Sequence, residues 1–175
     1  MSTVPLVDLK ASYARHRAAI DAAMREVIDN TRFIQGREVA EFEAAFARFC
    51  GTEYAIGVGS GTAALHLMMH ALNIGPGDAV AIPSHTFIAT AEPIIWLGAP
   101  PRFVEIAPAT GAMDPAALRT VLETGEVRAV IPVHIHGQPV DLAAISAIAA
   151  EAGIPVVEDA AQAHGAEYTN PDGTV

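Results

Sequence analysis

Apolar residues form five short runs along this chain, spaced about 25 residues apart, and within each run they occupy successive rather than alternating positions. Strands that helices cover on both faces show this pattern. The spacing leaves room for one crossover helix after each strand. We therefore predict an α/β fold, an αβα sandwich with a mostly parallel sheet, whose strands are Tyr54–Val58, Ala79–Pro83, Arg102–Ile106, Arg128–His134 and Ile154–Glu158.

Helical signals fill the intervals between these runs. One predicted helix carries its apolar residues on a single face, at Leu65, Met68, Met69 and Leu72. A second begins after Asp114, an N-cap residue that is followed by a first-turn proline. A third is expected at 142–152, where Asp141 is the N-cap and Gly153 ends the helix.

Two further helices are predicted before the first strand. One spans Tyr13–Asp29, and the other carries apolar residues at helical spacing, at Val39, Phe42, Phe46 and Phe49. Gly36 separates the two. We accordingly divide the chain into an N-terminal helical segment at 1–50 and an α/β segment at 51–175. Cys50 follows the aromatic residues of the second helix, so we expect it to pack in a core.

Composition narrows the class of protein. With 51% hydrophobic residues and a mean hydropathy of +0.33, the 175 residues can bury a sizeable core. The net charge of −10 repels nucleic acids and anionic membrane surfaces. The single cysteine excludes an internal disulfide, and no apolar run approaches the ~20 residues of a membrane span. We expect a cytoplasmic protein that binds neither nucleic acid nor membrane.

A glycine-rich turn, GVGSGTAAL at Gly57–Leu65, joins the first predicted strand to a helix. The backbone N–H groups of Gly61, Thr62 and Ala63 are unpaired at such a helix N-terminus and favour an anion such as phosphate. The alternative is an ordinary tight turn in which Ser60 or Thr62 caps the helix. The turn lacks the Walker lysine and the GxGxxG spacing, so the motif alone leaves both interpretations open.

The segment PSHTFIAT, at Pro83–Thr90, follows the second predicted strand. Phe87 can present its ring to a flat ligand by offset stacking, although a phenylalanine in this position could equally belong to the core. His85 is expected to be a hydrogen-bonded residue rather than a catalytic one.

The most informative segment is VVEDAAQAHGA at Val156–Ala166, where an apolar run ends in two carboxylates. Adjacent strand residues face opposite sides, so Glu158 and Asp159 are not expected to act as an acid–base pair. Asp159 opposite a heteroaromatic nitrogen would favour the protonated ring and make that ring an electron sink. Gln162 can offer its amide to a phenolate-like oxygen nearby.

Asp159 has two other interpretations: it could cap a following helix or ligate a metal ion. We expect no metal site, because the chain has no HxxxH or CxxC motif and no second strand-end carboxylate. His134 and His136 lack an acidic partner in the sequence. His136 and Gly137 are expected to shape a turn.

Five segments of this chain resemble the DegT/DnrJ/StrS-type sugar aminotransferases in order and spacing: RFIQGREVAEFEAAFA, GVGSGTAALHL, NIGPGDAVAIPSHTFIAT, VIPVHIHGQPVDL and VVEDAAQAHGA. The resemblance implies the large domain of a fold-type-I enzyme that uses pyridoxal 5'-phosphate. Such enzymes move an amino group, usually from glutamate, onto a keto group of a nucleotide-linked sugar. They are generally homodimers.

The resemblance also implies roles for particular residues. The SGTA turn of the family holds the cofactor phosphate, which here falls on Gly61 and Thr62. The aromatic residue of its PSxTF motif stacks on the pyridine ring, which falls on Phe87. The aspartate of EDAAQ pairs with the ring nitrogen, which makes Asp159 both a cofactor-binding and a catalytic residue, and Gln162 contacts the ring oxygen.

The chain departs from the family pattern in its lysines. The family binds its cofactor covalently through a lysine on a later strand and completes the substrate pocket with a second, small domain. Lys10 is the only lysine here, and it matches no catalytic position, so we expect it at the surface. The chain alone is therefore expected to be inactive, and of low stability, because two strands of the family sheet have no counterpart in it.

Three alternatives remain open from the sequence. The chain could be a non-catalytic module for binding pyridoxal phosphate or for dimerisation. It could belong to a lysine-free sugar dehydratase related to this family. It could also be a doubly wound nucleotide-binding domain. Asn170–Val175 is predicted to form a turn that leads into a further element.

Overall fold

The structure is a computed structural model that describes residues 4–5, 7–169 and 173. It divides into two compact units, Met1–Gly57 and Val58–Val175. The expected turn at Asn170–Val175 lies almost entirely outside the described residues.

The first unit contains two helices, α1 (Leu9–Asp29) and α2 (Arg37–Cys50), as the sequence predicts. Asp8 caps α1 by accepting a 2.9 Å hydrogen bond from the Ala11 amide. Arg37, the first residue of α2, forms an ion pair with Glu26 of α1. Gly36 is the N-cap of α2, which confirms its predicted place between the two helices.

Two predictions for the first unit are wrong. Cys50 is exposed, and its neighbour Phe49 is 62% exposed, so this end of α2 does not pack in a core of the chain. The run Tyr54–Val58 is not a strand, and Tyr54 and Ile56 are 76% and 83% exposed. A strand needs a neighbour for its backbone groups, and none of the described strands pairs with this run.

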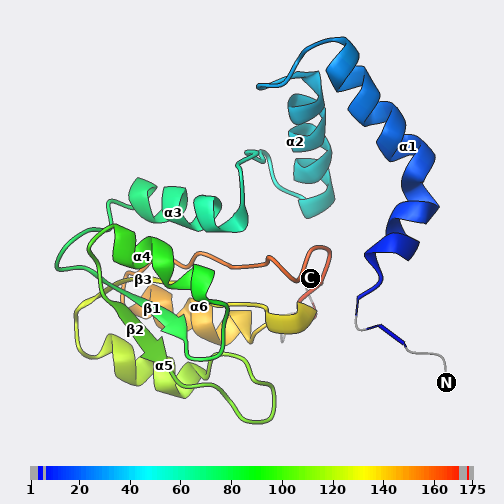
Figure 1. Ribbon diagram of the computed structural model, residues 1–175. Helices are drawn as coiled ribbons and strands as arrows, with labels where there is room; N and C mark the ends of the chain where they lie inside the picture. Colours follow the sequence, from blue (N-terminus) through cyan, green and yellow to red (C-terminus); the bar gives the residue numbers. More distant parts are fainter. Residues whose placement is uncertain (1–3, 6, 170–172, 174–175) are drawn as a thin grey trace. The chain divides into compact units, whose positions relative to one another are not determined.

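The second unit contains a parallel three-stranded sheet in the order β2-β1-β3 (Figure 1). Its strands are β1 (Ala79–Pro83), β2 (Pro101–Val104) and β3 (Val127–Val130). β1 is buried along its whole length, as the successive apolar positions predict.

A fourth segment continues the sheet beyond β3 without forming a full strand. The predicted strand Ile154–Glu158 appears only as two parallel bridges, Val130 to Val156 and Val133 to Asp159. The predicted third and fourth strands are likewise shorter than expected. Ile106 pairs with Met113 instead of continuing β2. After β3, Ile131 still donates a bond to Ala81 of β1, but beyond it the chain pairs only through the isolated bridge of Val133 to Asp159. The parallel order that the sequence predicts is nevertheless present.

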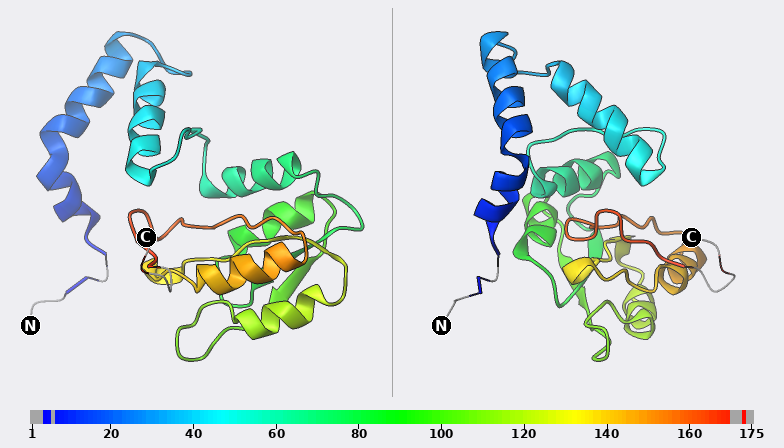
Figure 2. Two further views of the ribbon diagram at one scale, coloured as in Figure 1. Left: turned by 180° about the vertical axis from the view of Figure 1, so that it is seen from behind. Right: turned by 90° about the vertical axis from the view of Figure 1, so that its right-hand side faces the viewer.

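Helices cover both faces of the sheet, which confirms the αβα sandwich (Figure 2). They are α3 (Gly61–Ala71), α4 (Glu92–Trp96), α5 (Pro115–Leu122) and α6 (Leu142–Glu151), with short 3-10 turns η1 (Ile88–Thr90) and η2 (Ile135–Gly137). Ala79 and Ala81 of β1 face the core that α5 and α6 complete. Val80 and Ile82 face the opposite core, which α3 and α4 complete.

The predicted helix boundaries are confirmed at their caps. Asp114 accepts a 2.8 Å bond from Ala116 at the start of α5, and Asp141 accepts a 3.1 Å bond from Ala144 at the start of α6. Gly153, after α6, adopts a φ of 66°, the left-handed conformation that favours glycine at a helix end. No helix within the described residues is long and apolar enough to cross a membrane.

Candidate functional site

The residues singled out in the second unit gather at the carboxyl edge of the sheet. β1 leads directly into the segment that holds Phe87, and the bridge at Val133 brings Asp159 beside the segment that follows β3. α3 runs back along the sheet, so its N-terminus lies at this same edge (Figure 1). Ligands of parallel α/β sheets bind at this edge.

The N-terminus of α3 presents free backbone donors. The hydroxyl of Ser60, the N-cap, accepts a 3.1 Å bond from the Ala63 amide. Gly61 and Thr62 occupy the first two helical positions, where an amide has no acceptor within the helix. A Cβ added to Gly61 would meet nothing within 4 Å, so the space in front of these amides is open. The predicted cap by Ser60 is present, and the prediction of an unpaired amide is wrong for Ala63, because the Ser60 hydroxyl takes that donor.

Phe87 is not a core residue. Its side chain is 71% exposed, and it is the N-cap of η1, directly after the turn that leaves β1. The structure therefore excludes the core alternative and leaves the ring face accessible to a flat ligand. His85 is exposed as well, and its Nδ1 lies 3.1 Å from the carbonyl oxygen of Gly111, as expected for a hydrogen-bonded residue.

Asp159 is held at both carboxylate oxygens. Oδ2 accepts a 3.1 Å bond from the hydroxyl of Thr90, and Oδ1 accepts a 3.2 Å bond from the amide of Ala161. Its backbone pairs with Pro132 and His134 of the neighbouring segment. The bond to Ala161 closes a local turn rather than capping a helix, because no helix is present at 160–169. The capping alternative is therefore wrong.

Gln162 is fixed by a turn on the neighbouring segment. Its Oε1 accepts a 2.8 Å bond from the backbone amide of His136, which adopts a left-handed φ of 56°. Gly137 continues this turn with a φ of 85°, so the predicted turn at these two residues is confirmed. This bond uses the side-chain oxygen of Gln162 and leaves the side-chain NH2 group to donate to a ligand.

Glu158 points away from Asp159 and pairs with a buried histidine. Nε2 of His134 lies 2.9 Å from Oε2 of Glu158, and Nδ1 of His134 accepts a bond from the Val140 amide. Since Nδ1 accepts, the ring proton sits on Nε2 and is donated to the carboxylate. This hydrogen bond lowers the pKa of Glu158. The prediction that the two carboxylates serve different sides is confirmed.

Two contacts of this site are not apparent from the sequence. The first joins Thr90 to Asp159, and the second joins His134 to Glu158. A faint signal for the first exists, because Thr86 and Thr90 are four residues apart and can share one side of a helical turn. The second could not be found from spacing, because only the bridges beside β3 bring these segments together.

The structure does not assemble a metal site from the described residues, since no three His, Cys, Asp or Glu side chains among them are placed to hold an ion. His85 and His136 form a pair of rings at 5.9 Å, edge to face. No carboxylate that the structure describes joins this pair as a third ligand.

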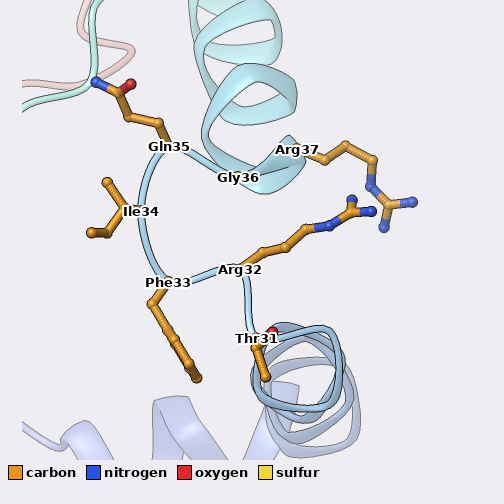
Figure 3. A pocket seen from close by; sticks show the side chains of 7 residues that line it. All are labelled: Thr31, Arg32, Phe33, Ile34, Gln35, Gly36 and Arg37. Carbon is orange, nitrogen blue, oxygen red and sulfur yellow. The ribbon is translucent and has the colours of Figure 1, made fainter.

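A separate hollow lies in the first unit, in the turn between α1 and α2. It is lined by Thr31, Arg32, Phe33, Ile34, Gln35, Gly36 and Arg37 (Figure 3). The guanidinium groups of Arg32 and Arg37 lie on one side, and Ile34 points to the other (Figure 3). Arg37 is already paired with Glu26 and Glu41. None of the predicted site residues lines this hollow.

The fold and the motifs at the sheet edge define the class of protein. The chain belongs to the DegT/DnrJ/EryC1/StrS aminotransferase family, whose model matches residues 15–174. This confirms the family resemblance and, with it, the fold: the chain corresponds to the N-terminal part of fold-type-I sugar aminotransferases.

Particular relatives are similar over nearly the whole chain. The dTDP-3-amino-3,4,6-trideoxy-alpha-D-glucose transaminase of Streptomyces venezuelae is 46% identical over 165 residues, which are 94% of this chain and 43% of that protein. The crystal structure of S. venezuelae DesV in complex with a ketimine intermediate matches with a TM-score of 0.91 and 44% identity, over 94% of this chain and 44% of that one.

A further solved structure contains a bound cofactor. The crystal structure of NtdA from Bacillus subtilis with bound PMP, pyridoxamine phosphate, has a TM-score of 0.89 and 30% identity, over 94% of this chain and 38% of that one. The chain spans less than half the length of each of these relatives.

Proposed function

We propose that this chain is the cofactor-binding part of an aminotransferase that uses pyridoxal 5'-phosphate. The whole enzyme would transfer an amino group from glutamate to a keto group of a nucleotide-linked sugar. The sugar substrate is supported by the similarity to the S. venezuelae dTDP-3-amino-3,4,6-trideoxy-alpha-D-glucose transaminase. The cofactor is supported by the NtdA structure with bound PMP.

The observation that carries this proposal is the placement of three complementary groups at one sheet edge. The open amides at the start of α3 fit a phosphate, because backbone donors and the helix dipole both favour an anion. The exposed ring of Phe87 fits the face of a pyridine ring. The carboxylate of Asp159 fits a protonated ring nitrogen.

When bound, the cofactor supplies a cationic ring that withdraws electrons from the carbon that carries the amino group. Asp159 would hold the proton at the ring nitrogen, because a carboxylate beside that nitrogen favours its charged form. Phe87 would cover one face of the ring and exclude water from it. Gln162 would donate its amide to the ring oxygen, since its own oxygen is already bonded to His136.

The second unit, which holds the proposed site, contains no lysine that could anchor the cofactor covalently, because Lys10 is the only lysine of the sequence. Lys10 is exposed on α1 in the first unit. This observation favours a second candidate function for the chain by itself, which is reversible, non-catalytic binding of the cofactor. In the whole enzyme, a homodimer in this proposal, a residue outside this sequence would supply the amine.

Absorbance spectroscopy tests the proposal. The full-length enzyme should show a yellow band with pyridoxal phosphate that borohydride fixes to the protein, and it should aminate a keto sugar nucleotide with glutamate. This chain alone should bind the cofactor reversibly, with no covalent product after borohydride. A chain that ignores the cofactor would contradict both candidate functions and favour a nucleotide-binding domain instead.

A further inference from the structure

Two threonine hydroxyls form a short chain that ends on Asp159. Oγ1 of Thr86 lies 2.8 Å from Oγ1 of Thr90, which in turn donates to Oδ2 of Asp159 across 3.1 Å. Thr90 is 1% exposed, so its hydroxyl cannot rely on bulk water for a partner. The two protein groups therefore account for the hydrogen bonding of this buried hydroxyl.

The direction of each bond follows from the number of protons. An ionised carboxylate can only accept, so the single hydroxyl proton of Thr90 points to Asp159. Thr90 then has no proton left for Thr86, and Thr86 must be the donor in the other bond. The protons run in one direction, from Thr86 through Thr90 to Asp159. A bond that ends on a charged acceptor is also the stronger kind.

The same residues restrain the orientation of the carboxylate. Thr90 holds Oδ2 from one side, and the amide of Ala161 holds Oδ1 from the other. A carboxylate with one donor on each oxygen cannot rotate without losing a bond. Each oxygen can still accept a further bond, so the oriented carboxylate remains able to accept from a ligand N–H.

Thr90 also restrains the turn that carries Phe87. Its backbone amide donates a 3.0 Å bond to the carbonyl oxygen of Phe87 in η1. A single residue is therefore bonded through its backbone to the residue with the exposed ring and through its side chain to the acid. α3 packs against η1, which places this turn beside the helix that offers the open amides.

We propose that Thr90, ordered by Thr86, is a positioning residue that aims the Asp159 carboxylate at the ring nitrogen of the cofactor and ties that carboxylate to the Phe87 turn. This inference rests on the proposed function. It assigns the hydroxyl of Thr90 a role in ligand geometry that goes beyond satisfying a buried polar group.

The experiment uses this chain, the ligand PMP, which needs no lysine, and four variants. Thr90→Val removes the donor at nearly constant volume, and Thr90→Ser restores it. Thr86→Val removes only the outer donor, and Thr124→Val is the matched control, because the Thr124 hydroxyl bonds Val121 far from this site. Calorimetry measures affinity, nitrogen-15 NMR of ring-labelled PMP reports protonation of the ring nitrogen, and thermal unfolding checks the fold.

Thr90→Val should weaken PMP binding about tenfold and shift the ring nitrogen toward its deprotonated resonance, because a bond to a charged group is lost. Thr90→Ser and Thr124→Val should behave like the unaltered chain. Normal affinity and a protonated ring in folded Thr90→Val would overturn the inference. Should Thr90→Val fail to fold, Thr86→Val decides instead: a severalfold loss of affinity supports the inference, and unchanged binding overturns it.

The two proposals fail differently. If the unaltered chain binds no PMP, the proposed function is rejected, and the inference is rejected with it. If the unaltered chain binds PMP with a protonated ring and the threonine variants do the same, only the role of Thr90 is rejected.

Discussion

The hydroxyl of Thr90 donates to the carboxylate of Asp159 across 3.1 Å, although 69 residues separate the two in the sequence. This bond joins the turn after β1 to the segment beside β3. Through Thr90, it connects the acid to the turn that bears the exposed ring of Phe87, whose carbonyl oxygen accepts from the Thr90 amide. The proposed function depends on this arrangement.

Asp159→Asn should abolish most transamination in the full-length enzyme while leaving the fold intact. The neutral amide has one acceptor oxygen, so it can accept from only one of the two donors, Thr90 and Ala161. It cannot favour a protonated ring nitrogen, and we expect a loss of about 100-fold or more in kcat. Steady-state kinetics with a keto sugar nucleotide measures the effect. Asp114→Asn is the control, because asparagine caps a helix as well as aspartate does. Turnover of Asp159→Asn at the normal rate would reject the role of Asp159.

Gly61→Val should weaken cofactor binding without unfolding the chain. A Cβ at Gly61 meets nothing within 4 Å, so the side chain is accommodated, yet it occupies the space from which a phosphate would reach the amides. We expect at least about tenfold weaker binding of PMP by calorimetry, since the anion loses backbone donors. Gly75→Val is the control, because its added Cβ is equally free of contacts and lies at the other end of α3. Equal loss in both variants would argue against a phosphate site.

Asp141→Ala should lower the free energy of unfolding by about 1–2 kcal/mol, the usual cost of removing an N-cap. The same Oδ1 that caps α6 also accepts a 2.8 Å bond from the hydroxyl of Tyr168. Urea denaturation measures the change. Asp141→Asn should recover most of the loss, because its amide oxygen can serve both donors. If the two variants are equally unstable, charge rather than capping is responsible.

Glu158 should make stability depend on pH in the acidic range. The hydrogen bond from His134 holds the pKa of Glu158 below its ordinary value of 4.5. A group whose pKa is lowered by folding stabilises the protein above the unfolded pKa and loses that contribution as the pH falls through the folded pKa. We expect a loss below pH 4.5, under about 1 kcal/mol because the side chain is nearly half exposed and screened.

Denaturation curves at several pH values check this expectation. Glu158→Gln cannot titrate, so its stability should change less between pH 4.5 and the lowered pKa than that of the unaltered chain. Exposed Glu167→Gln should keep the normal dependence. An unchanged pH profile in Glu158→Gln would show that its bond to His134 contributes nothing to folding.

The sequence predicts this fold best at elements that are set by neighbouring residues, such as a buried apolar strand or a helix N-cap. β1 and the caps at Asp114 and Asp141 are found where expected, because an apolar run between turns and an N-cap residue act over a few neighbours. The prediction of a strand at Tyr54–Val58 is wrong, and the reason is physical. An apolar run forms a strand only when a neighbouring strand hydrogen-bonds to its backbone. None of the described strands pairs with this run.

The candidate site is predictable in its residues but not in its connections. Phe87, Asp159 and Gln162 are recognised by their place after apolar runs and by family resemblance. The bonds of Asp159 to Thr90 and of Gln162 to the His136 amide depend on which segments lie side by side, and on a left-handed turn at a non-glycine residue. Periodicity along one segment carries no information about such pairs.

The alternation of side-chain size along β1 also limits how the chain can misfold. Small residues, Ala79 and Ala81, face α5 and α6, while the larger Val80 and Ile82 face α3 and α4. A slip of one position would exchange the two sets, overfilling one helical layer and leaving voids in the other. The difference in side-chain volume therefore disfavours the shifted register of β1. It thereby helps to keep the turn after β1, which carries Phe87, in its native position.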